Sequence, residues 1–399
     1  MKNVAILGFG VVGSGTANLL TNNASIIEKK TGEKIQVKRI LDLRDFPDSP
    51  FGHLVTHDIN DIINDKDIDI VAEVIGGSHP AYEFTCACLR AGKSVVSSNK
   101  EVVANFGAEL TQIARENNVS YMFEASVGGG IPVLRPMMND LSANSFSSVH
   151  GILNGTTNYI LTQMTEYKKD FDTVLKDAQK KGYAEANPTA DVEGIDAMRK
   201  ICILGAIAFG KLFPTDKIYC KGITDIRLVD HENASKIEAK IKLIGSAVKI
   251  EDKILECVRP CIVKNDNPLY SISDVFNGIL VNGNYTGDVM FYGRGAGAEP
   301  TASAVVSDII DIVCRSSNYE ISWEKATESD MYDFADFECS RYVCIKKEQK
   351  QALVASGIVD SFISEDDEVS LVTKYITEKA FNDILSKNDI APTAIICIL

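Results

Sequence analysis

Val4-Ala-Ile-Leu-Gly8-Phe-Gly10-Val-Val-Gly13 is the stretch, near the start of the chain, that decides the fold of the first part of the protein. Four apolar residues predict a buried strand, glycines follow at the spacing Gly-x-Gly-x-x-Gly, and a helical pattern of apolar residues comes next. In this context Gly8 permits a tight turn, Gly10 lets backbone amides approach a pyrophosphate, and Gly13 lets the helix pack on the strand. The pattern therefore predicts a dinucleotide-binding turn, with a purely structural turn as the alternative.

The end of the next predicted strand bears on which dinucleotide binds. This strand covers residues 35–41, and Asp42 follows it, with Arg39 and Arg44 nearby. An acidic residue at such a strand end hydrogen-bonds the ribose hydroxyls of NAD, whereas an arginine accommodates the 2′-phosphate of NADP. Because both kinds of side chain are present, the sequence leaves NAD and NADP open. It also leaves open that all three residues are solvated loop charges.

Strands and helices continue to alternate after this point. Apolar runs predict strands at residues 68–75, 94–97 and 120–124, and a helix at residues 81–91. This alternation predicts an α/β protein with a parallel, doubly wound sheet, whose ligands bind at the carboxyl ends of the strands. Lys100 follows one of those ends and a run of glycines follows another, so we expect both to lie near a ligand.

A second stretch, residues 182–200, combines charge with an apolar helix. The segment from Asp191 to about residue 209 predicts a helix so apolar that most of its circumference is buried. Its first turns nevertheless carry Asp196 and Lys200, which are four residues apart and share a face. Gly194, inside the predicted helix, indicates a close approach by another group. Either the two charges neutralise each other in the core or they line a reaction site, and this stretch alone does not decide.

Composition excludes several classes of function. The 399 residues carry a net charge of -14, which argues against general binding to nucleic acid or to anionic membranes. No apolar run reaches the length of a membrane span, and glycines interrupt the N-terminal run before it could form a signal peptide. The ten cysteines are too sparse for a disulfide scaffold and lack metal-ligand spacing. We therefore expect a cytoplasmic protein with reduced thiols that binds neither nucleic acid nor membrane.

The C-terminal residues predict a separate small unit. Strands are expected at residues 341–345, 352–362, 369–376 and 393–399, with a helix at residues 378–385. Residues 348–351 run almost directly into the second of these strands, so little room is left for a helix after the first strand. We therefore expect a unit made mainly of strands with one short helix.

The chain resembles the homoserine dehydrogenases over residues 1–330, through several motifs together. These are Gly8 to Gly13, Ser97-Ser-Asn-Lys-Glu101, Phe123-Glu-Ala-Ser-Val-Gly-Gly-Gly-Ile-Pro132, Gly151-Ile-Leu-Asn-Gly-Thr-Thr-Asn-Tyr159, residues 182–200, and Gly293-Arg-Gly-Ala-Gly297. The resemblance implies that the protein interconverts L-homoserine and L-aspartate-4-semialdehyde with NAD(P), in threonine, methionine and isoleucine biosynthesis. It also implies a homodimer or homotetramer.

The same resemblance implies a division into domains. Residues 1–132 would form a Rossmann-type dinucleotide-binding domain, completed by a helix from about residue 300 to residue 316. Residues 133–300 would form an α+β domain for substrate binding, catalysis and dimerisation. Residues 338–399 resemble a reduced ACT-like unit of the ferredoxin-like class, without the usual Asp-x-Pro-Gly type turn or the first helix. We therefore do not expect threonine feedback through this unit, and oligomerisation is its alternative task.

Matched residue by residue, the resemblance assigns roles to individual side chains. Lys200 matches the lysine that transfers the proton, Asp196 its substrate-binding acidic partner, Glu185 the carboxylate that holds the substrate, and Lys100 a second active-site lysine near the cofactor. Together with the glycine turn, the expected cofactor-binding residues are Gly8, Gly10, Val11, Val12, Gly13, Asp42, Ser97, Lys100, Gly182 and Gly295. A monovalent cation, Na⁺, would be held by one side chain and by backbone carbonyls of Glu124, Val127, Gly129 and Ile131.

Elementary chemistry is consistent with a lysine as the acid. Hydride transfer to an aldehyde creates an alkoxide, and a positioned acid contributes about 10²- to 10⁴-fold by protonating it. None of the five histidines lies in the motifs, whereas a second cation nearby can lower the pKa of a lysine. The α-ammonium of the substrate gives Glu185 and Asp196 an electrostatic task, although Asp191 and Glu193 remain competitors for it.

Two rival functions remain. A phosphorylating semialdehyde dehydrogenase would need a nucleophilic cysteine with a histidine base, and the sequence places no cysteine in such a setting. A non-catalytic dinucleotide sensor, with the C-terminal unit as its effector module, would bind the dinucleotide without turnover. That reading leaves Asp196 and Lys200 without a task.

Overall fold

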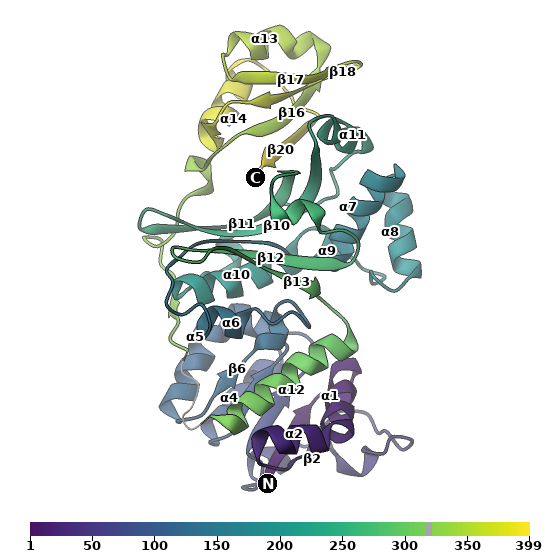
Figure 1. The fold of residues 1–399 in the computed structure, drawn as a ribbon, viewed down its shortest axis with the longest axis vertical. Helices are drawn as coiled ribbons and strands as arrows, with labels where there is room; N and C mark the ends of the chain where they lie inside the picture. The colour runs from purple at the N-terminus through teal and green to yellow at the C-terminus, as the bar shows by residue number, and fades with distance from the viewer. Residues whose placement is uncertain (316–320) are drawn as a thin grey trace. The chain divides into compact units, whose positions relative to one another are not determined.

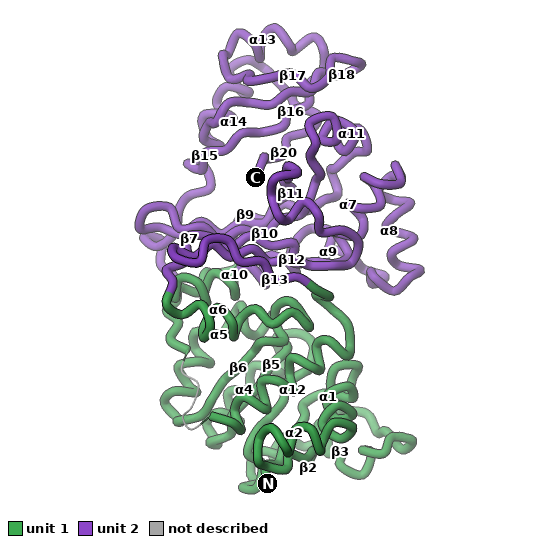
Figure 2. The backbone as a smooth tube through the Cα atoms, in the orientation of Figure 1, with its two compact units in different colours: residues 1–143, 202–215, 293–325 green, residues 144–201, 216–292, 326–399 purple. Residues whose placement is uncertain are grey.

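The computed structural model of the protein describes residues 1–315 and 321–399 (Figure 1). The chain divides into two compact units, and each unit is assembled from three segments of sequence (Figure 2). Unit 1 comprises Met1–Ala143, Cys202–Thr215 and Gly293–Lys325, and unit 2 comprises Asn144–Ile201, Asp216–Tyr292 and Ala326–Leu399. The first return of the chain from unit 2 to unit 1 takes place inside one helix, α10 (Ile195–Phe209).

The centre of unit 1 is a parallel sheet. Its strand order is β3-β2-β1-β4-β5-β6, and each neighbouring pair runs parallel. The strands are β1 (Lys2–Leu7), β2 (Ile35–Leu41), β3 (Val55–Thr56), β4 (Ile70–Glu73), β5 (Ser94–Ser97) and β6 (Tyr121–Met122). This order defines a Rossmann-type doubly wound sheet and confirms the predicted fold class of the N-terminal region. Val4 to Leu7 of β1 have no exposed surface, as expected for a central strand of such a sheet.

Helices surround this sheet. They are α1 (Val11–Asn22), α2 (Ala24–Thr31), α3 (Asn60–Ile63), α4 (Ala81–Arg90), α5 (Lys100–Glu116), α6 (Leu134–Met138) and α12 (Ala298–Cys314). A short parallel pair, β8 (Lys211–Leu212) and β14 (Glu324–Lys325), also belongs to unit 1. Helix α12 packs on α1 so closely that a Cβ atom on Gly15 would lie 3.1 Å from the Cβ atom of Ala302. This is the helix predicted from about residue 300 to 316, and residue 316 lies outside the described residues.

Unit 2 is built on a long mixed sheet. Among the described residues its strand order is β13-β12-β7-β10-β11-β20-β16-β18-β17, and β9 also pairs with β11. The strands are β7 (Phe146–Ile152), β9 (Tyr219–Cys220), β10 (Ala239–Ile250), β11 (Lys253–Lys264), β12 (Phe276–Gly283), β13 (Gly287–Arg294), β16 (Arg341–Lys346), β17 (Val359–Glu365), β18 (Glu368–Thr373) and β20 (Ala394–Ile398). A small antiparallel pair, β15 (Glu338–Cys339) and β19 (Ile376–Thr377), stands apart. Strand β13 carries the chain from unit 2 into unit 1.

The helices of unit 2 correct one prediction. They are α7 (Gly155–Tyr167), α8 (Phe171–Lys180), α9 (Thr189–Val192), the first turns of α10, α11 (Leu228–Lys236), α13 (Lys350–Ala355) and α14 (Glu378–Lys387). The single helix expected from Asp191 onward is wrong, because Gly194 separates α9 from α10 with a φ of +82°. A Cβ atom at Gly194 would lie 3.1 Å from Val258 and 3.2 Å from Cys220, so the glycine permits both the turn and close packing on β11 and β9.

The C-terminal part of unit 2 corrects a second prediction. The strand expected at residues 352–362 is wrong: α13 ends at Ala355, and β17 begins only at Val359. From β16 onward the large elements follow the order β16-α13-β17-β18-α14-β20, which is the βαββαβ order of a ferredoxin-like unit. The helix expected to be missing after the first strand is therefore present. This unit shares one continuous sheet with the rest of unit 2, because β20 pairs with β11 at Cys261 and Ile262.

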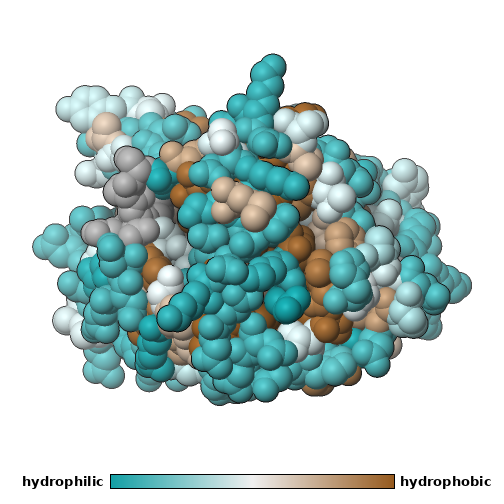
Figure 3. Space-filling model, turned by 90° about the horizontal axis from the view of Figure 1, so that it is seen from below, coloured by the Kyte–Doolittle hydropathy of each residue, from teal (hydrophilic) through white to brown (hydrophobic). Residues whose placement is uncertain are grey.

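The molecular surface in one view is mainly polar (Figure 3). Figure 3 shows a face that is mainly hydrophilic, on which hydrophobic residues form scattered groups. Among the described residues, no helix combines the length and apolarity that crossing a bilayer requires. The ten cysteines are all free, and eight of them are buried.

Candidate functional site

The glycine turn of unit 1 has the geometry that its sequence predicts. Gly8 has a φ of +94°, and helix α1 begins at Val11, directly after Gly10. A Cβ atom at Gly13 would lie 2.0 Å from the carbonyl oxygen of Gly8, a contact that no side chain permits. By contrast, no atom lies within 4 Å of the Cβ position at Gly10, so the space beside that residue is open. The N-terminus of α1 thus presents backbone amides over an uncovered glycine, an arrangement suited to a phosphate group.

Asp42, at the end of β2, forms a hydrogen bond with the glycine turn. Its Oδ2 accepts a hydrogen bond of 2.7 Å from the backbone amide of Phe9, which lies between the first two glycines. The side chain of Arg44 donates two further hydrogen bonds of 3.0 Å, one to each carboxylate oxygen. These bonds from Arg44 are the main reason that the pKa of Asp42 falls to about 2. The Asp42 carboxylate is therefore ionised and already paired, while the side chain of Arg44 is 64% exposed.

A polar network lies at the carboxyl ends of β4 and β5. The hydroxyl of Ser97 donates a hydrogen bond of 2.6 Å to the buried carboxyl of Glu73, which also accepts the backbone amide of Ile75 at 2.8 Å. Asn99 donates to the carbonyls of Ile75 (2.9 Å) and Gly77 (2.7 Å), and its Oδ1 caps the start of α5. Lys100 is the first residue of that helix. The network thus fixes the loop after β4 relative to the start of the helix that carries Lys100.

Glu73 was not among the residues predicted from the sequence. The signal that could have identified it is an acidic residue at the end of an otherwise apolar strand, since all four residues of β4 are buried. Burial raises the pKa of this carboxyl to about 7, against the opposing effect of the hydrogen bonds from Ser97, Ile75 and Asn99. Glu73 therefore titrates near neutral pH, whereas an ordinary glutamate is ionised there.

This titration makes the stability of the protein depend on pH. Because the pKa of Glu73 is higher in the folded protein than in the unfolded chain, the stability it contributes is complete below about pH 4.5 and is lost as the pH rises through about 7. We expect Glu73→Gln to remove this dependence, so that the free energy of unfolding of wild type falls by roughly 3 kcal/mol relative to the variant over that range. Urea unfolding at several pH values measures the difference.

A matched control is Glu116→Gln, which replaces an exposed carboxylate at the end of α5. We expect this variant to follow the wild-type pH dependence. A constant difference between wild type and Glu73→Gln at every pH would show that the carboxyl does not titrate in this range.

In unit 2 the predicted pair Asp196 and Lys200 forms a buried ion pair. Nζ of Lys200 lies 2.7 Å from Oδ2 of Asp196 and donates a hydrogen bond of 2.8 Å to the carbonyl of Leu153, at the end of β7. The side chain of Asn154 donates to Oδ2 of Asp196 at 2.9 Å and to Oδ1 of Asp191 at 2.7 Å. Asp196 and Lys200 both lie in the first turns of α10. They are thus held in place by Leu153 and Asn154, which lie just before α7.

Two other expected residues of unit 2 lie on the loop between α8 and α9. Glu185 is exposed, and its backbone carbonyl accepts a hydrogen bond of 3.1 Å from the side chain of Gln179. Gly182 has a φ of +74° just after α8, with no atom within 4 Å of its Cβ position. Both residues therefore lie on a loop with open space beside it, and neither contacts the buried pair through a hydrogen bond among those that the structure describes.

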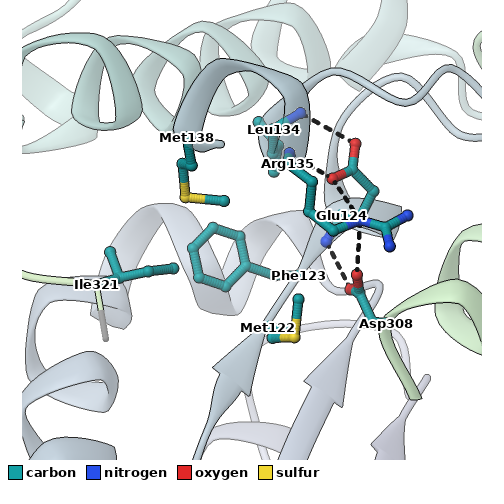
Figure 4. Close-up of a pocket in the computed structure, with 8 residues that line it drawn as sticks. All are labelled: Met122, Phe123, Glu124, Leu134, Arg135, Met138, Asp308 and Ile321. Carbon is teal, nitrogen blue, oxygen red and sulfur yellow. Dashed lines mark hydrogen bonds and ion pairs between the residues drawn. The ribbon is translucent and has the colours of Figure 1, made fainter. Parts of the chain in front are cut away.

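Glu124 of unit 1, an expected residue of the cation site, lies in a buried polar cluster (Figure 4). Its buried carboxylate accepts hydrogen bonds from the backbone amides of Val133 (2.6 Å), Leu134 (3.0 Å) and Arg135 (2.7 Å), and from Nε of Arg135 at 3.4 Å. A carboxylate offers about four lone-pair positions, so these bonds use its capacity. The side chain therefore satisfies the amides at the start of α6.

Asp308 of α12 completes this buried cluster. Its Oδ2 accepts the backbone amide of Glu124 at 2.9 Å, and Nε of Arg135 lies 3.5 Å from its Oδ1. Burial, and then the neighbouring charge of Glu124, raises the pKa of Asp308 well above its usual value. The cavity beside the cluster has a volume of about 10 Å³, which is room for about one water molecule. The cluster thus ties the start of α6 to α12 within unit 1.

The remaining residues of the expected cation site lie on the glycine loop of unit 1. Val127 and Ile131 are buried, and Gly129 has a φ of +54°. A Cβ atom at Gly129 would lie 2.7 Å from the carbonyl carbon and oxygen of Gly295, so the glycine is needed where these two loops meet. The structure therefore brings Gly129 and Gly295 together within unit 1.

Comparisons with known proteins relate these features to one family. Two family models match the chain: "Homoserine dehydrogenase, NAD binding domain" over residues 8–124, and "Homoserine dehydrogenase" over residues 132–310. The homoserine dehydrogenase of a Synechocystis species is 43% identical over 316 residues, which is 78% of this chain and 73% of the relative.

Solved structures show the same likeness. The crystal structure of a homoserine dehydrogenase from Thiobacillus denitrificans matches with a TM-score of 0.92 and 33% identity, over 100% of this chain and 98% of the other. A hyperthermophilic archaeal homoserine dehydrogenase in complex with NADPH matches with a TM-score of 0.67 and 28% identity, over 78% of this chain and 98% of the other.

Proposed function

The chain belongs to the homoserine dehydrogenase family, and from this premise we propose how its residues divide the work of the reaction. The protein is an oxidoreductase of amino-acid biosynthesis that interconverts L-homoserine and L-aspartate-4-semialdehyde with a nicotinamide dinucleotide. The observation that carries the proposal is the buried pair of Lys200 and Asp196, with a separation of 2.7 Å. Oxidation of L-homoserine, followed through the near-ultraviolet absorbance of the reduced dinucleotide, tests it.

In the proposed mechanism Lys200 moves the proton. The dinucleotide, when bound, supplies the hydride to the carbonyl carbon of the semialdehyde. Lys200 donates a proton to the developing alkoxide, and in the reverse direction it accepts the proton of the hydroxyl. Asp196 and the carbonyl of Leu153 orient the ammonium for this transfer. The role of Lys100, as a second lysine beside the cofactor, is part of the proposal and is supported by its place at the carboxyl end of the unit 1 sheet.

Acidic residues are proposed to bind the substrate ammonium. Glu185, on its exposed loop, can meet an incoming amino acid without first breaking a buried hydrogen bond of its side chain. Asp196 is held by Lys200 and Asn154, so it contributes negative charge at a fixed position. Charge-assisted hydrogen bonds of this kind are roughly twice as strong as neutral ones. Asp191 shares the amide of Asn154 with Asp196. It is therefore a stronger competitor than Glu193 for binding the substrate ammonium.

For the dinucleotide, the proposed contacts are the glycine turn, Val11, Val12, Asp42, Ser97, Lys100, Gly182 and Gly295. Ser97 offers its backbone, because its hydroxyl is already bonded to Glu73. At the end of β2, a 2′-phosphate would meet the exposed guanidinium of Arg44 and not a bare carboxylate, since Arg44 already pairs with Asp42. We therefore propose that both NAD and NADP are accepted, and that acceptance of NADP depends on Arg44.

Arg44→Ala tests the cofactor proposal. The variant loses the cation and exposes the charge of Asp42, so we expect KM for NADP to rise about 10-fold or more, while KM for NAD changes little. Initial rates of homoserine oxidation with each dinucleotide provide the measurement. Arg39→Ala is the matched control, because Arg39 lies near the same strand end and its side chain donates to the carbonyl of Lys38. Equal losses with NAD and NADP in Arg44→Ala would contradict the proposal.

The expected Na⁺ site fits these residues only in part. The carboxylate of Glu124 does not fit as a cation ligand, because four N–H groups already occupy it. The backbone carbonyls of Val127, Gly129 and Ile131 remain the proposed ligands, and no step of the mechanism depends on the ion.

Several further expectations remain proposals. The ten free cysteines support a reducing compartment such as the cytoplasm. Assembly into a dimer or tetramer, and the relation of residues 338–399 to ACT modules, are also proposed. The alternative of a non-catalytic sensor is not favoured, because the related proteins are enzymes.

A further inference from the structure

The side chain of Asn154 links the start of one helix to acidic residues of two others. It lies at the junction of β7 and α7, and only 5% of its surface is exposed. Its Oδ1 accepts the backbone amide of Thr157 at 2.8 Å, which makes Asn154 the N-cap of α7. Its Nδ2 donates to Asp191 at 2.7 Å and to Asp196 at 2.9 Å. The orientation of the amide is fixed by these partners, because the helix end needs an acceptor and the two carboxylates need donors.

The two carboxylates come from different helices. Asp191 lies on α9 and Asp196 on α10, and Gly194 breaks the chain between them with its positive φ. Bringing two like charges to one small group is unfavourable unless a donor stands between them. The amino group of Asn154 supplies that donor, with one N–H for each acid. This amide therefore links the two acids directly.

The same connection extends to Lys200. Oδ2 of Asp196 accepts both the amide of Asn154 and the ammonium of Lys200, and that ammonium also donates to the carbonyl of Leu153. We propose that Asn154 is a positioning residue, which fixes Asp196, and through it Lys200, in the geometry for proton transfer and which couples Asp191 to that pair. The inference rests on the proposed roles of Lys200 and Asp196. It extends them to a residue whose described side-chain hydrogen bonds go to Thr157, Asp191 and Asp196.

Other side chains that cap helices cannot replace the amide of Asn154. Serine and aspartate are both good N-caps and would keep the bond to the amide of Thr157. Serine loses the bonds to both acids because its single hydroxyl is short, and aspartate adds a third negative charge beside them. A role limited to capping α7 would be preserved by either residue, whereas the positioning role would be lost in both.

The test compares Asn154→Ser and Asn154→Asp with wild type in the full-length enzyme. For Asn154→Ser we expect kcat to fall about 10²-fold, as for a misplaced reactive group, with the Kd of the dinucleotide unchanged. For Asn154→Asp we expect a larger loss. We also expect the acid limb of the kcat profile to move to higher pH, because the crowded acids Asp191 and Asp196, beside Lys200, retain protons longer. A capping role alone would leave this pH profile unchanged.

Two controls separate the possible outcomes. Asp170→Ser makes a similar exchange of cap residue at α8, where Asp170 accepts the amide of Thr173 at 2.9 Å, and should retain wild-type kcat. Wild-type kcat and pH profile in Asn154→Ser would overturn the positioning role if Lys200→Ala is inactive. An active Lys200→Ala would instead remove Lys200 from the proposed mechanism, whereas failure of the wild-type protein to oxidise L-homoserine would overturn the proposed function itself. If Asn154→Ser fails to fold, Asn154→Asp carries the test, because its carboxylate retains the cap.

Discussion

Lys200→Ala is expected to lower kcat by about 10³-fold while the Kd of the dinucleotide stays close to wild type. The reason is that the variant removes the proposed acid and leaves the glycine turn of unit 1 untouched. The ammonium of Lys200 is held by Asp196 and by the carbonyl of Leu153, so the variant loses a proton donor that is fixed in position. Steady-state rates in both directions, together with dinucleotide titration by fluorescence, give the two quantities.

The variant also leaves Asp196 buried without its cation, which destabilises the protein. Urea unfolding of Lys200→Ala must therefore accompany the kinetics, and Lys200→Met serves as a second variant that fills the space. Lys221→Ala is the matched control, since Lys221 lies in the same unit, is partly exposed and has Asp225 4.0 Å away. Turnover near the wild-type rate in folded Lys200→Ala would remove Lys200 from the mechanism.

Gly13→Ala is expected to weaken dinucleotide binding strongly and to lower the stability of unit 1. A Cβ atom there would lie 2.0 Å from the carbonyl oxygen of Gly8, so helix α1 and the turn must move apart. That movement displaces the helix N-terminus that faces the phosphates. Because backbone and not a flexible side chain is in the way, we expect the loss in affinity to reach at least about 10²-fold. Dinucleotide titration and thermal unfolding measure the two effects.

Gly10→Ala gives the informative contrast. Its Cβ atom would meet nothing within 4 Å and its φ is −79°, so the free protein should accept alanine without loss of stability. If Gly10 faces the pyrophosphate as proposed, this variant should lose affinity while keeping the wild-type unfolding temperature. Normal binding in Gly10→Ala would place the phosphates elsewhere. Wild-type affinity for the dinucleotide in Gly13→Ala would contradict the prediction, because it would show that α1 can move away from Gly8 without loss of the binding site.

The sequence predicted those features whose cause is local. Glycine spacing after an apolar strand predicted the turn, and four-residue spacing predicted that Asp196 and Lys200 share a face. The errors arose where a local signal is ambiguous. Apolar residues 352–354 suggested a strand but lie in α13, because short apolar runs are compatible with either structure. Gly194 suggested a close approach inside one helix, whereas its positive φ ends one helix before the next begins.

The parts of the site that were missed depend on distant contacts. Glu73 meets Ser97 from a neighbouring strand, and Asn154 meets Asp196 from a helix much later in the chain. Neither spacing has a periodic signature, so no local pattern marks these partners. The hydrogen bonds of the Glu124 side chain are likewise absent from any local pattern, since its oxygens accept the amides at the start of α6. A resemblance in sequence does not show how many bonds a side chain already makes.

The parallel pairing of β20 with β11 has a consequence for biosynthesis. Strand β11 ends at Lys264, but its neighbour β20 begins only at Ala394, so the edge of β11 at Cys261 and Ile262 remains unpaired while the intervening residues leave the ribosome. Unpaired strand edges associate readily with other chains. Pairings between such distant segments also form slowly. The nascent chain therefore passes through a period in which this edge of β11 is unpaired, and the sheet of unit 2 is completed only when the last residues have been made.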